Sequence, residues 1–232
     1  MISTTKSSAR PLHLGIVPDG NRRWAESRGM LPWNGHEKGY AILTSLIEWC
    51  VKNPDISALT LWVFSTENWK RDKKEVTKLM ELFQRYLIEQ RGNFVENKIR
   101  LLHAGRKDRI PATLKTLIEN LETETKDFSD FTLQIGLDYG GKDEIVRSIS
   151  RLIEKREQPT EENVRASLDH PQVPDIDLVI RTSGEQRTSN FFIWQSAYAE
   201  WWFTEKLFPE LTQEDLAKAV EYYKQRKRRF GS

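Results

Sequence analysis

Hydrophobic and polar positions follow two different patterns along the chain. Short runs that are almost wholly apolar predict buried strands at residues 13–17, 58–64, 99–104, 131–137 and 176–180. Between these runs, apolar residues recur at helical spacing, which predicts helices at residues 22–29, 37–51, 74–97, 111–125, 142–156 and from 212 towards 230. A further short helix is expected in the polar connection before residue 176. Apolar strands separated by helices predict an α/β fold, with a mostly parallel central sheet of about six strands flanked by helices.

The length of the chain favours a single domain. Its 232 residues are many for one domain and few for two, and no stretch has the composition of a linker. We therefore expect a flexible N-terminal tail at residues 1–12 and one domain over residues 13–232. No run of about 18 apolar residues and no signal-peptide pattern is present, which favours a cytoplasmic protein. The one cysteine, Cys50, lies in an apolar stretch and is expected to be a buried structural thiol.

The first predicted strand runs into a corner with several chemically active residues, in the sequence HLGIVPDGNRRW at residues 13–24. Gly20 permits a positive φ, and Asn21 is expected to cap the following helix by accepting a hydrogen bond from a free amide. Free amides at a helix start attract anions, and the two arginines that follow strengthen this attraction. Asp19 is suited to hold a divalent cation that touches a bound phosphate. The alternative is an ordinary strand-turn-helix corner whose charged side chains face solvent.

Polar residues also follow the other predicted strands, and parallel α/β sheets bind their ligands at the carboxyl ends of the strands. The segments expected to share this edge are residues 19–23, 65–71, 138–141 and 181–190. Arginines that gather there repel one another unless a polyanion or carboxylates neutralise them, which indicates a ligand with several negative charges. An ordinary ion-pair network with Glu67, Glu185 and Glu200 is the alternative.

The overall charge says little, because 36 basic and 34 acidic residues leave a net charge of +2. A basic run at residues 224–229 is more informative. It suits nucleic acid, anionic lipid or phosphate. A solvated helix end, whose positive charges complement the helix dipole, explains the run equally well.

Three segments, together with the C-terminal end, carry a resemblance to a known family. PDGNRRWA from residue 18, LTLWVFSTENWKR from residue 59 and DLVIRTSGEQRTSNFFIWQSAYAEWWF from residue 177, followed by RKRRFG, resemble the signature segments of the cis-prenyltransferases. This family contains the undecaprenyl and dehydrodolichyl diphosphate synthases, and the resemblance extends from His13 to Gly231. The aspartate-rich DDxxD element of the all-helical trans-type synthases is absent, in agreement with the alternation of strands and helices.

The resemblance implies a fold of the undecaprenyl diphosphate synthase type in a single catalytic domain. It also implies that isopentenyl diphosphate is added to an allylic diphosphate primer, with each new double bond cis. Dimethylallyl, geranyl, farnesyl and geranylgeranyl diphosphates are the candidate primers. The primer loses its diphosphate as an allylic cation forms, so the site must stabilise negative charge on the leaving group through arginines, helix amides and Mg²⁺. The product is expected to be a polyprenyl diphosphate of short to medium length.

Roles for individual residues follow from the same resemblance. Asp19 matches the essential aspartate that positions Mg²⁺ and the diphosphates, and Glu200 matches a carboxylate that completes the metal site in family dimers. Asn21 or a diphosphate oxygen accepts the departing proton. The substrate-binding positions are Gly20, Asn21 and Arg23 for the primer's diphosphate, with Arg22 adjacent and His36 as a further contact; Trp24; Arg181, Arg187 and Ser189 for isopentenyl diphosphate; and Ser65, Asn68, Trp69 and Arg71 in a mobile loop that closes over both.

Three positions depart from the usual family pattern. Pro32 replaces an arginine, so the lost phosphate contact must come from Arg22 or Arg28 or leave primer binding weaker. Val63 stands where many medium-chain members have alanine, and its extra methyl groups narrow the tunnel for the product. Gln186 stands where some bacterial members have histidine. This position varies within the family, so the difference says little about function. The end of the tunnel is expected among residues 59–64 of the strand and Leu79, Phe83 and Leu87 of the long helix.

Two other functions explain parts of the sequence. A non-catalytic subunit of a heteromeric cis-prenyltransferase would keep the fold but lose the metal and clamp residues, whereas Asp19, Arg181 and Arg187 are all present. A nucleic-acid-binding protein explains the basic run but not the acidic residues at a phosphate site, so no nucleic-acid partner is expected. The aromatic stretch at residues 199–203 indicates burial in the monomer or a homodimer interface, and the resemblance favours the homodimer. The tail at residues 226–231 is expected to reach the partner's active site, and a membrane surface is expected to be touched transiently during product release.

Overall fold

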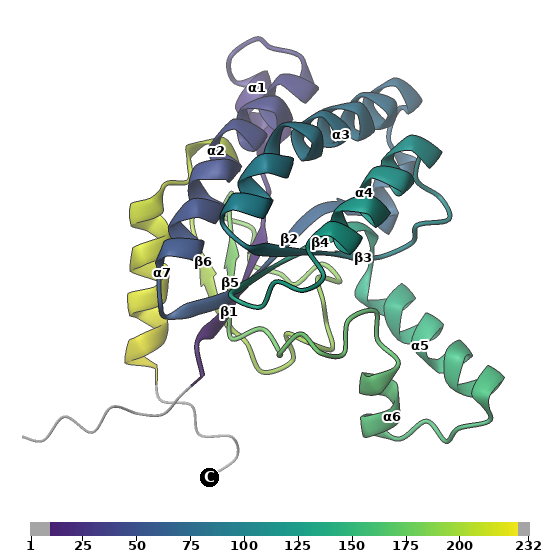
Figure 1. Ribbon diagram of the computed structural model, residues 1–232. Coiled ribbons are helices and arrows are strands. Elements are labelled where there is room, and N and C mark those ends of the chain that lie inside the picture. The colour runs from purple at the N-terminus through teal and green to yellow at the C-terminus, as the bar shows by residue number, and fades with distance from the viewer. Residues whose placement is uncertain (1–9, 227–232) are drawn as a thin grey trace, which may run out of the picture.

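A six-stranded sheet in which every neighbouring pair is parallel forms the centre of the molecule (Figure 1). The computed structural model describes residues 10–226. The strand order is β3-β4-β2-β1-β5-β6, which confirms the predicted α/β fold. The strands are β1 (Leu12–Val17), β2 (Ile56–Ser65), β3 (Ile99–Ala104), β4 (Phe131–Tyr139), β5 (Leu178–Arg181) and β6 (Glu200–Phe203).

Helices connect the strands at the positions that the sequence pattern predicts. The α-helices of the described residues are α1 (Asn21–Glu26), α2 (Pro32–Lys52), α3 (Lys73–Glu96), α4 (Ala112–Glu124), α5 (Gly141–Lys155), α6 (Glu161–Ala166) and α7 (Gln213–Gln225), and the 3₁₀ helices are η1 (Thr66–Lys70) and η2 (Phe208–Glu210). α2 begins at Pro32, earlier than predicted, because the fixed φ of proline suits the first turn of a helix. α7 begins as predicted after Thr212, which forms a capping box with Asp215.

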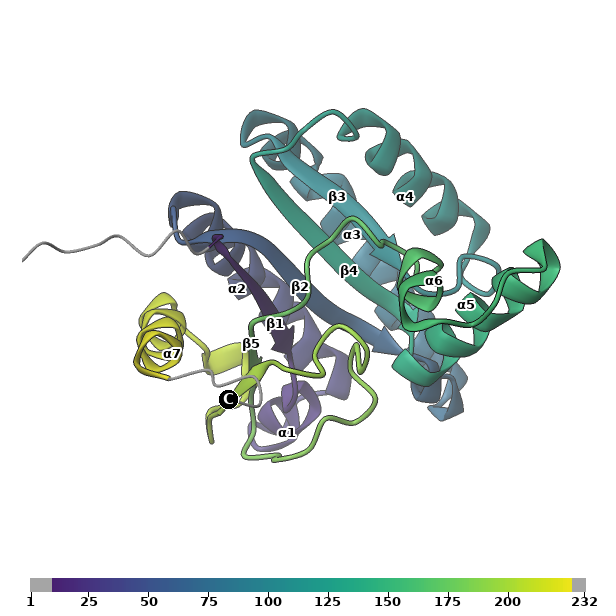
Figure 2. The same cartoon turned by 90° about the horizontal axis from the view of Figure 1, so that it is seen from below.

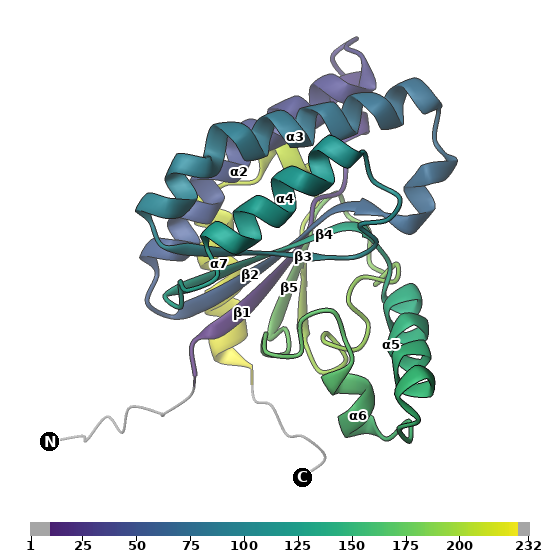
Figure 3. The ribbon, with the colours of Figure 1, turned by 45° about the vertical axis from the view of Figure 1, so that its right-hand side comes forward.

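Helices cover both faces of the sheet. α2, α3, α4 and α7 pack on one face, where they share a continuous core with the strands (Figures 1 and 3). α5 and α6 lie on the opposite side of the sheet (Figures 1 and 2). The segment between β5 and β6 covers the sheet on that side with Phe191 and Phe192, and Phe192 stacks on Tyr139 with ring centroids 3.8 Å apart. Strands buried on both faces explain why their sequences are almost continuously apolar.

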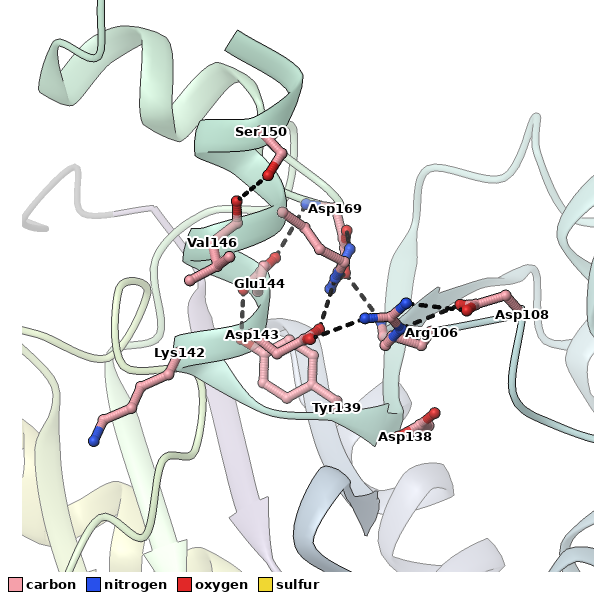
Figure 4. A network of polar contacts seen from close by, with 12 residues as sticks. Arg106, Asp108, Asp138, Tyr139, Lys142, Asp143, Glu144, Val146, Ser150 and Asp169 are labelled. Carbon is pink, nitrogen blue, oxygen red and sulfur yellow. Dashed lines mark hydrogen bonds and ion pairs between the residues drawn. The ribbon is translucent and has the colours of Figure 1, made fainter. Parts of the chain in front are cut away.

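A network of charged side chains fixes α5 and the segment after α6 beside the end of β4 (Figure 4). Asp169 accepts hydrogen bonds from Arg147 at 2.7 Å, from Arg151 at 2.9 Å and from the backbone N–H of Gly105 at 3.0 Å. Burial alone would raise the pKa of Asp169, but the two arginines and this amide lower it to about 2. Lys142, at the start of α5, points away from the network. The network therefore holds this corner in place.

Some boundaries differ from the sequence-based expectations. The aromatic stretch at residues 199–203 contains the edge strand β6, which the apolar-run pattern does not predict because only four residues take part. The predicted boundary of the tail at residue 12 falls at the start of β1, and Arg10 already forms an ion pair with Asp177 at 2.9 Å. The predicted continuation of the last helix towards residue 230 lies outside the described residues, and so does most of the tail at residues 226–231.

Two expectations about side chains and membrane insertion can be compared directly with the structure. Cys50 is fully buried and free, as predicted, and burial raises the pKa of its thiol to about 12. A buried neutral thiol of this kind is a poor nucleophile. No helix within residues 10–226 is both long and apolar enough to cross a membrane.

Candidate active site

The turn after β1 differs from its predicted form. Gly20 is the N-cap of α1 and has a φ of 95°, a left-handed conformation that glycine adopts without strain. Asn21 is therefore the first helical residue, and its side chain does not cap the helix; its Nδ2 donates to the carbonyl of Pro18 at 3.0 Å. The buried Oδ1 of Asn21 has no hydrogen-bond partner in the described part of the chain. Asn21 itself lines the cavity described below.

α2 packs tightly against the same turn because it carries two glycines. A Cβ at Gly35 would lie 1.8 Å from the carbonyl oxygen of Asn21, and a Cβ at Gly39 would lie 2.6 Å from its Oδ1. Both distances are far shorter than a normal contact between heavy atoms. Glycine at these positions therefore lets α2 hold Asn21 in place, and His36 on the same helix reaches the site.

An ion pair between Asp19 and Arg181 forms the centre of the site. Arg181 Nη2 donates to Asp19 Oδ2 at 3.0 Å, and its Nη1 donates to Ser189 Oγ at 2.8 Å. The backbone N–H of Gly20 donates to Asp19 Oδ1 at 2.8 Å. The side chain of Arg181 is 4% exposed, whereas that of Asp19 is 35% exposed. The carboxylate is therefore positioned by its neighbours and still accessible from the cavity.

A small anion pocket lies beside this ion pair. It has a volume of about 380 Å³, and its walls are Pro18, Asp19, Gly20, Asn21, Arg22, Arg23, Glu26, His36 and Arg71. The wall contains three guanidinium groups and two carboxylates, and Glu75 and Glu185 pair with these guanidinium groups from outside the wall. Arginine forks match phosphate oxygens in geometry as well as in charge. The pocket is thus suited to a diphosphate, as the sequence predicts for Gly20, Arg22, Arg23 and His36.

His36 is a neutral polar group in the wall of this pocket. Burial, followed by the positive charges of Arg71 and Arg22, lowers its pKa from 6.5 to about 3. Its Nε2 is buried and has no hydrogen-bond partner among residues 10–226. A buried polar atom without a partner is rare in folded proteins. A ligand oxygen that meets this nitrogen would satisfy it.

A larger cavity of about 660 Å³ continues from the anion pocket into the protein. Its polar end includes Asp19, Asn21, His36, Arg71, Arg181 and Ser189, and its apolar end includes Tyr40, Leu43, Leu61, Val63, Phe64, Leu79 and Phe208. The apolar residues come from α2, β2 and α3, and from η2 beside them. One site therefore joins an anion-binding end to an apolar end, and Val63 and Leu79 line it as predicted.

The segment after β2 contributes one side of this site. Ser65 and Asn68 form a capping box that fixes η1, and both residues line the cavity together with Glu67 and Arg71. Trp69, predicted as a substrate contact, does not line the cavity. Its Nε1 donates to Asp138 at 2.8 Å, and its ring packs against Phe64 with centroids 5.1 Å apart. Trp69 therefore anchors the segment from behind.

Two further predicted contacts do not line the cavity. The ring of Trp24 lies under the guanidinium of Arg28, whose central carbon is 4.3 Å from the ring centroid. The side chain of Arg187 is 61% exposed and forms an ion pair with Glu185, which also binds Arg23 at 3.3 Å. The alternative of an ion-pair network is therefore correct for Glu185. The sequence alone does not show which way the side chains of Trp24 and Arg187 point.

Glu200 lies level with the amino ends of the parallel strands, whereas Asp19 lies at their carboxyl ends. It pairs with Leu178 in the register of β5 and β6, whereas Arg181, at the other end of β5, pairs with the last residue of β1. Asp19 follows that end of β1, so the two carboxylates cannot share a metal ion within one chain. Glu200 instead accepts from Arg226 at 3.1 Å. In residues 10–226, no group of three or more His, Cys, Asp or Glu side chains is arranged to hold a metal ion.

The structure also shows which arginine can replace the one lost at Pro32, and which partners the basic run has. Arg28 is held by Glu210 at 3.0 Å and stacks on Trp24, so Arg22, which lines the anion pocket, is the better replacement for the lost arginine. Lys224 forms an ion pair with Asp55 at 2.6 Å. The described part of the basic run is thus neutralised by the protein's own carboxylates.

Tyr40, Lys142 and Asn190 are among the residues that line the cavity but were not assigned from the sequence. Asn190 Oδ1 accepts from the backbone N–H of Lys142 at 2.7 Å, which joins the segment after β5 to the start of α5. Neither Lys142 nor Asn190 has a local sequence signal that marks it as a cavity residue. Tyr40 had one, because it lies four residues after His36 on a helix and must share its face.

A parallel α/β protein with an anion pocket that opens into an apolar cavity is suited to a ligand with a phosphate head and a hydrocarbon tail. Comparison with known proteins agrees with this class. The family model described as "Putative undecaprenyl diphosphate synthase" matches residues 17–231. The chain therefore belongs to this prenyltransferase family, and it is a cis-prenyltransferase.

Individual relatives cover nearly the whole chain. An isoprenyl transferase of Aquifex aeolicus is 43% identical over 224 residues, which are 95% of this chain and 96% of that protein. An isoprenyl transferase of Fusobacterium nucleatum is 44% identical over 222 residues, with the same coverage. The crystal structure of lavandulyl diphosphate synthase from Lavandula x intermedia in complex with dimethylallyl diphosphate matches with a TM-score of 0.90 and 33% identity, over 96% of this chain and 98% of that one. A probable undecaprenyl diphosphate synthase from Campylobacter jejuni matches with a TM-score of 0.83 and 36% identity, over 97% and 100%.

Proposed function

We propose that this prenyltransferase adds isopentenyl diphosphate to an allylic diphosphate primer, with Mg²⁺ as its metal ion and a product of short to medium length. The observation that carries the proposal is that the anion pocket and the apolar cavity are continuous, since both are lined by Pro18, Asp19, Asn21, His36 and Arg71. A prenyl diphosphate has a polyanionic head and an apolar tail and matches both parts at once. The dimethylallyl diphosphate complex of the Lavandula enzyme supports this class of substrate.

The primer's diphosphate is assigned to the anion pocket. Arg22, Arg23 and Arg71 would neutralise its charge, and the unpartnered Nε2 of His36 would meet one of its oxygens. As the bond between the diphosphate and the allylic carbon breaks, negative charge grows on the leaving group. Fixed positive charges stabilise this charge most where water is excluded. The primer's tail would then lie along the apolar end of the cavity.

Isopentenyl diphosphate is assigned to the opposite side of Asp19. Arg181 and Ser189 line the cavity there, and the buried Nε of Arg181 has no partner in the described residues. Arg187 can join them only if its side chain leaves Glu185, to which it is paired. We therefore assign Arg187 a role that depends on this rearrangement.

The residues around Asp19 fit a magnesium ion that is held together with substrate. Mg²⁺ commonly binds one or two carboxylates plus substrate phosphate oxygens, and Asp19 supplies an accessible carboxylate between the two proposed diphosphate positions. Glu200 would have to come from a second copy of the chain. When bound, Mg²⁺ would stabilise the negative charge of the departing diphosphate.

The departing proton is assigned to a diphosphate oxygen. The amide oxygen of Asn21 is a far weaker base than a diphosphate, so Asn21 would orient the reacting groups and leave the proton to the diphosphate. Its position supports this role, because Asn21 lines the cavity and its side chain is fixed by the hydrogen bond to the carbonyl of Pro18 at 3.0 Å.

A homodimer is part of the proposal. β6 is the edge strand of the sheet, and Trp201, Trp202 and Phe203 are only partly buried within one chain, which is the composition of an interface core. We also propose that the enzyme works in the cytoplasm and touches a membrane surface only to release an apolar product. Sedimentation at micromolar concentration tests the assembly: a fully active monomer would contradict it.

The activity is tested with the purified protein, Mg²⁺, labelled isopentenyl diphosphate and primers of increasing length. The proposal predicts incorporation of label into a prenyl diphosphate, dependence on added Mg²⁺ and cis geometry of the new double bonds. No incorporation with any primer would contradict it. Full incorporation in the presence of a chelator would remove the metal from the proposal but leave the substrate assignment intact.

A further inference from the structure

Three aromatic side chains pack on one another beside the apolar part of the cavity, and we call them the aromatic wall: Tyr40 from α2, and Phe83 and Tyr86 from α3. Tyr40 stacks on Tyr86 with ring centroids 5.4 Å apart and lies 6.1 Å from the centroid of Phe83. Phe83 is 1% exposed and Tyr86 is 5% exposed, so both are held in the core. Of the three, only Tyr40 lines the cavity.

A second hollow lies on the other side of the aromatic wall. This outer groove has a volume of about 460 Å³ and runs between α2 and α3, which lie side by side (Figure 3). Its walls are Glu37, Tyr40, Ala41, Thr44, Leu82, Arg85, Tyr86, Glu89 and Gln90. Tyr40 is the one residue that lines both the cavity and the outer groove. Its ring therefore separates the two spaces.

We propose that Tyr40, backed by Tyr86, sets the length of the product by stopping the growing tail at the boundary between the cavity and the outer groove. This inference rests on the proposed function, because it concerns the tail of the prenyl diphosphate. The outer groove is then the path that a longer tail takes when the ring of Tyr40 is removed. Tyr40 is a specificity-determining residue in this proposal and takes no part in the chemistry.

The size of the cavity is consistent with this stop. A cavity of about 150 Å³ holds one benzene molecule, so the 660 Å³ cavity has room for about four groups of that size. The diphosphate of isopentenyl diphosphate occupies part of this space at the polar end, beside Arg181 and Ser189. About two or three five-carbon units remain for the tail on the same scale. A tail of this length would fill the apolar part of the cavity, which Tyr40 lines.

The position of Tyr40 gives it more influence on product length than the residues that the sequence predicts at the end of the tunnel. Val63 lines the side of the cavity on β2, and its replacement by alanine removes two methyl groups without reaching the outer groove. Phe83, which belongs to the aromatic wall, and Leu87 are fully buried and do not line the cavity. Truncation of Tyr40 alone joins the two spaces.

The test compares the products of the wild type, Tyr40→Ala and Tyr40→Phe by chromatography after incubation with labelled isopentenyl diphosphate. Tyr40→Ala should extend the main product by at least one five-carbon unit, whereas Tyr40→Phe, which keeps the ring, should leave it unchanged. The matched control is Tyr222→Ala on α7, where the tyrosine packs under Arg226, away from the cavity and the outer groove. An active Tyr40→Ala enzyme with the wild-type product would overturn the proposal.

A binding measurement separates this inference from the proposed activity. Calorimetry with allylic diphosphates of increasing length, without isopentenyl diphosphate, needs no turnover. An overfilled site costs enough to weaken binding by about five- to a hundredfold, so affinity for the wild type should fall beyond a limiting length. The limit should move by at least one unit in Tyr40→Ala, or in Tyr40→Leu where the alanine variant fails to fold. The same limit in the folded variant and the wild type would refute the role of Tyr40, while a wild type that binds but does not react would refute the activity alone.

Discussion

His13 should make the folded protein less stable below neutral pH. Its ring is buried in β1, where Nδ1 donates to the carbonyl of Pro174 at 2.7 Å and Nε2 lies 2.7 Å from the hydroxyl oxygen of Thr60. Burial is the main cause that lowers the pKa of His13 from 6.5 to about 4. The ring therefore stays neutral in the folded protein under mildly acidic conditions in which the unfolded chain binds a proton.

The sign and size of the effect follow from this difference in pKa. Below pH 6.5 the unfolded state takes up a proton that the folded state refuses, so the free energy of unfolding falls as the pH is lowered. The fall ends near pH 4, where His13 also titrates in the folded state. A shift from 6.5 to about 4 corresponds to a total of about 3 kcal/mol. Between pH 7 and pH 5 the loss should be about 2 kcal/mol.

Urea unfolding at pH 7, 6 and 5 measures this loss. His13→Gln should be less stable than the wild type at pH 7 because it disturbs a packed site, but the gap should narrow by about 2 kcal/mol at pH 5. Thr60→Val is the matched control, since it removes the hydroxyl beside the ring and keeps the histidine. Its pH dependence should follow the wild type. Parallel pH profiles for His13→Gln and the wild type would refute the reasoning.

Three further predictions concern the site. Val63→Ala should lengthen the product and Val63→Phe should shorten it, because overfilling a packed wall costs about 1–3 kcal/mol; identical products by chromatography would show that Val63 does not limit the tail. Arg23→Ala should chiefly raise the KM for the primer and Arg187→Ala that for isopentenyl diphosphate, by about tenfold or more, and equal effects on both substrates would contradict the assignment. Gly39→Ala should lower kcat because its Cβ would lie 2.6 Å from Asn21 Oδ1, and wild-type steady-state rates would show that the position of Asn21 is unimportant.

Local patterns predict the fold of this chain well because each element buries a recognisable face. The long helix α3 and the strands β3 and β4 carry apolar residues at a regular period, and the structure has them within two residues of the predicted bounds. β6 was not predicted because four half-buried residues at a sheet edge have no such period. The prediction that Asn21 caps α1 was wrong for a related reason. Both Gly20 and Asn21 are suited to the N-cap position, and the left-handed backbone there favours Gly20, which adopts it without strain.

Without the family resemblance, the polar part of the candidate site was predictable only where a residue follows a strand. Asp19 and Arg181 meet because β1 and β5 are parallel neighbours, so their carboxyl ends share an edge. The direction of a long side chain depends on partners from distant segments, which local sequence does not reveal. Trp69 turns to Asp138 and Arg187 turns to Glu185 for this reason. Tyr40 belongs to the site through the packing of α2 on α3.

The most direct test of the proposed site is the rate of isopentenyl diphosphate incorporation by Asp19→Ala. Asp19 lies between Arg181 and the anion pocket with an accessible carboxylate, so its loss should remove several kcal/mol of charge stabilisation and lower turnover by about a thousandfold or more. Asp130→Ala, which removes a surface carboxylate paired only loosely with Lys98 at 4.0 Å, is the control and should keep the wild-type rate. A folded Asp19→Ala enzyme that incorporates label at nearly the wild-type rate would contradict the account.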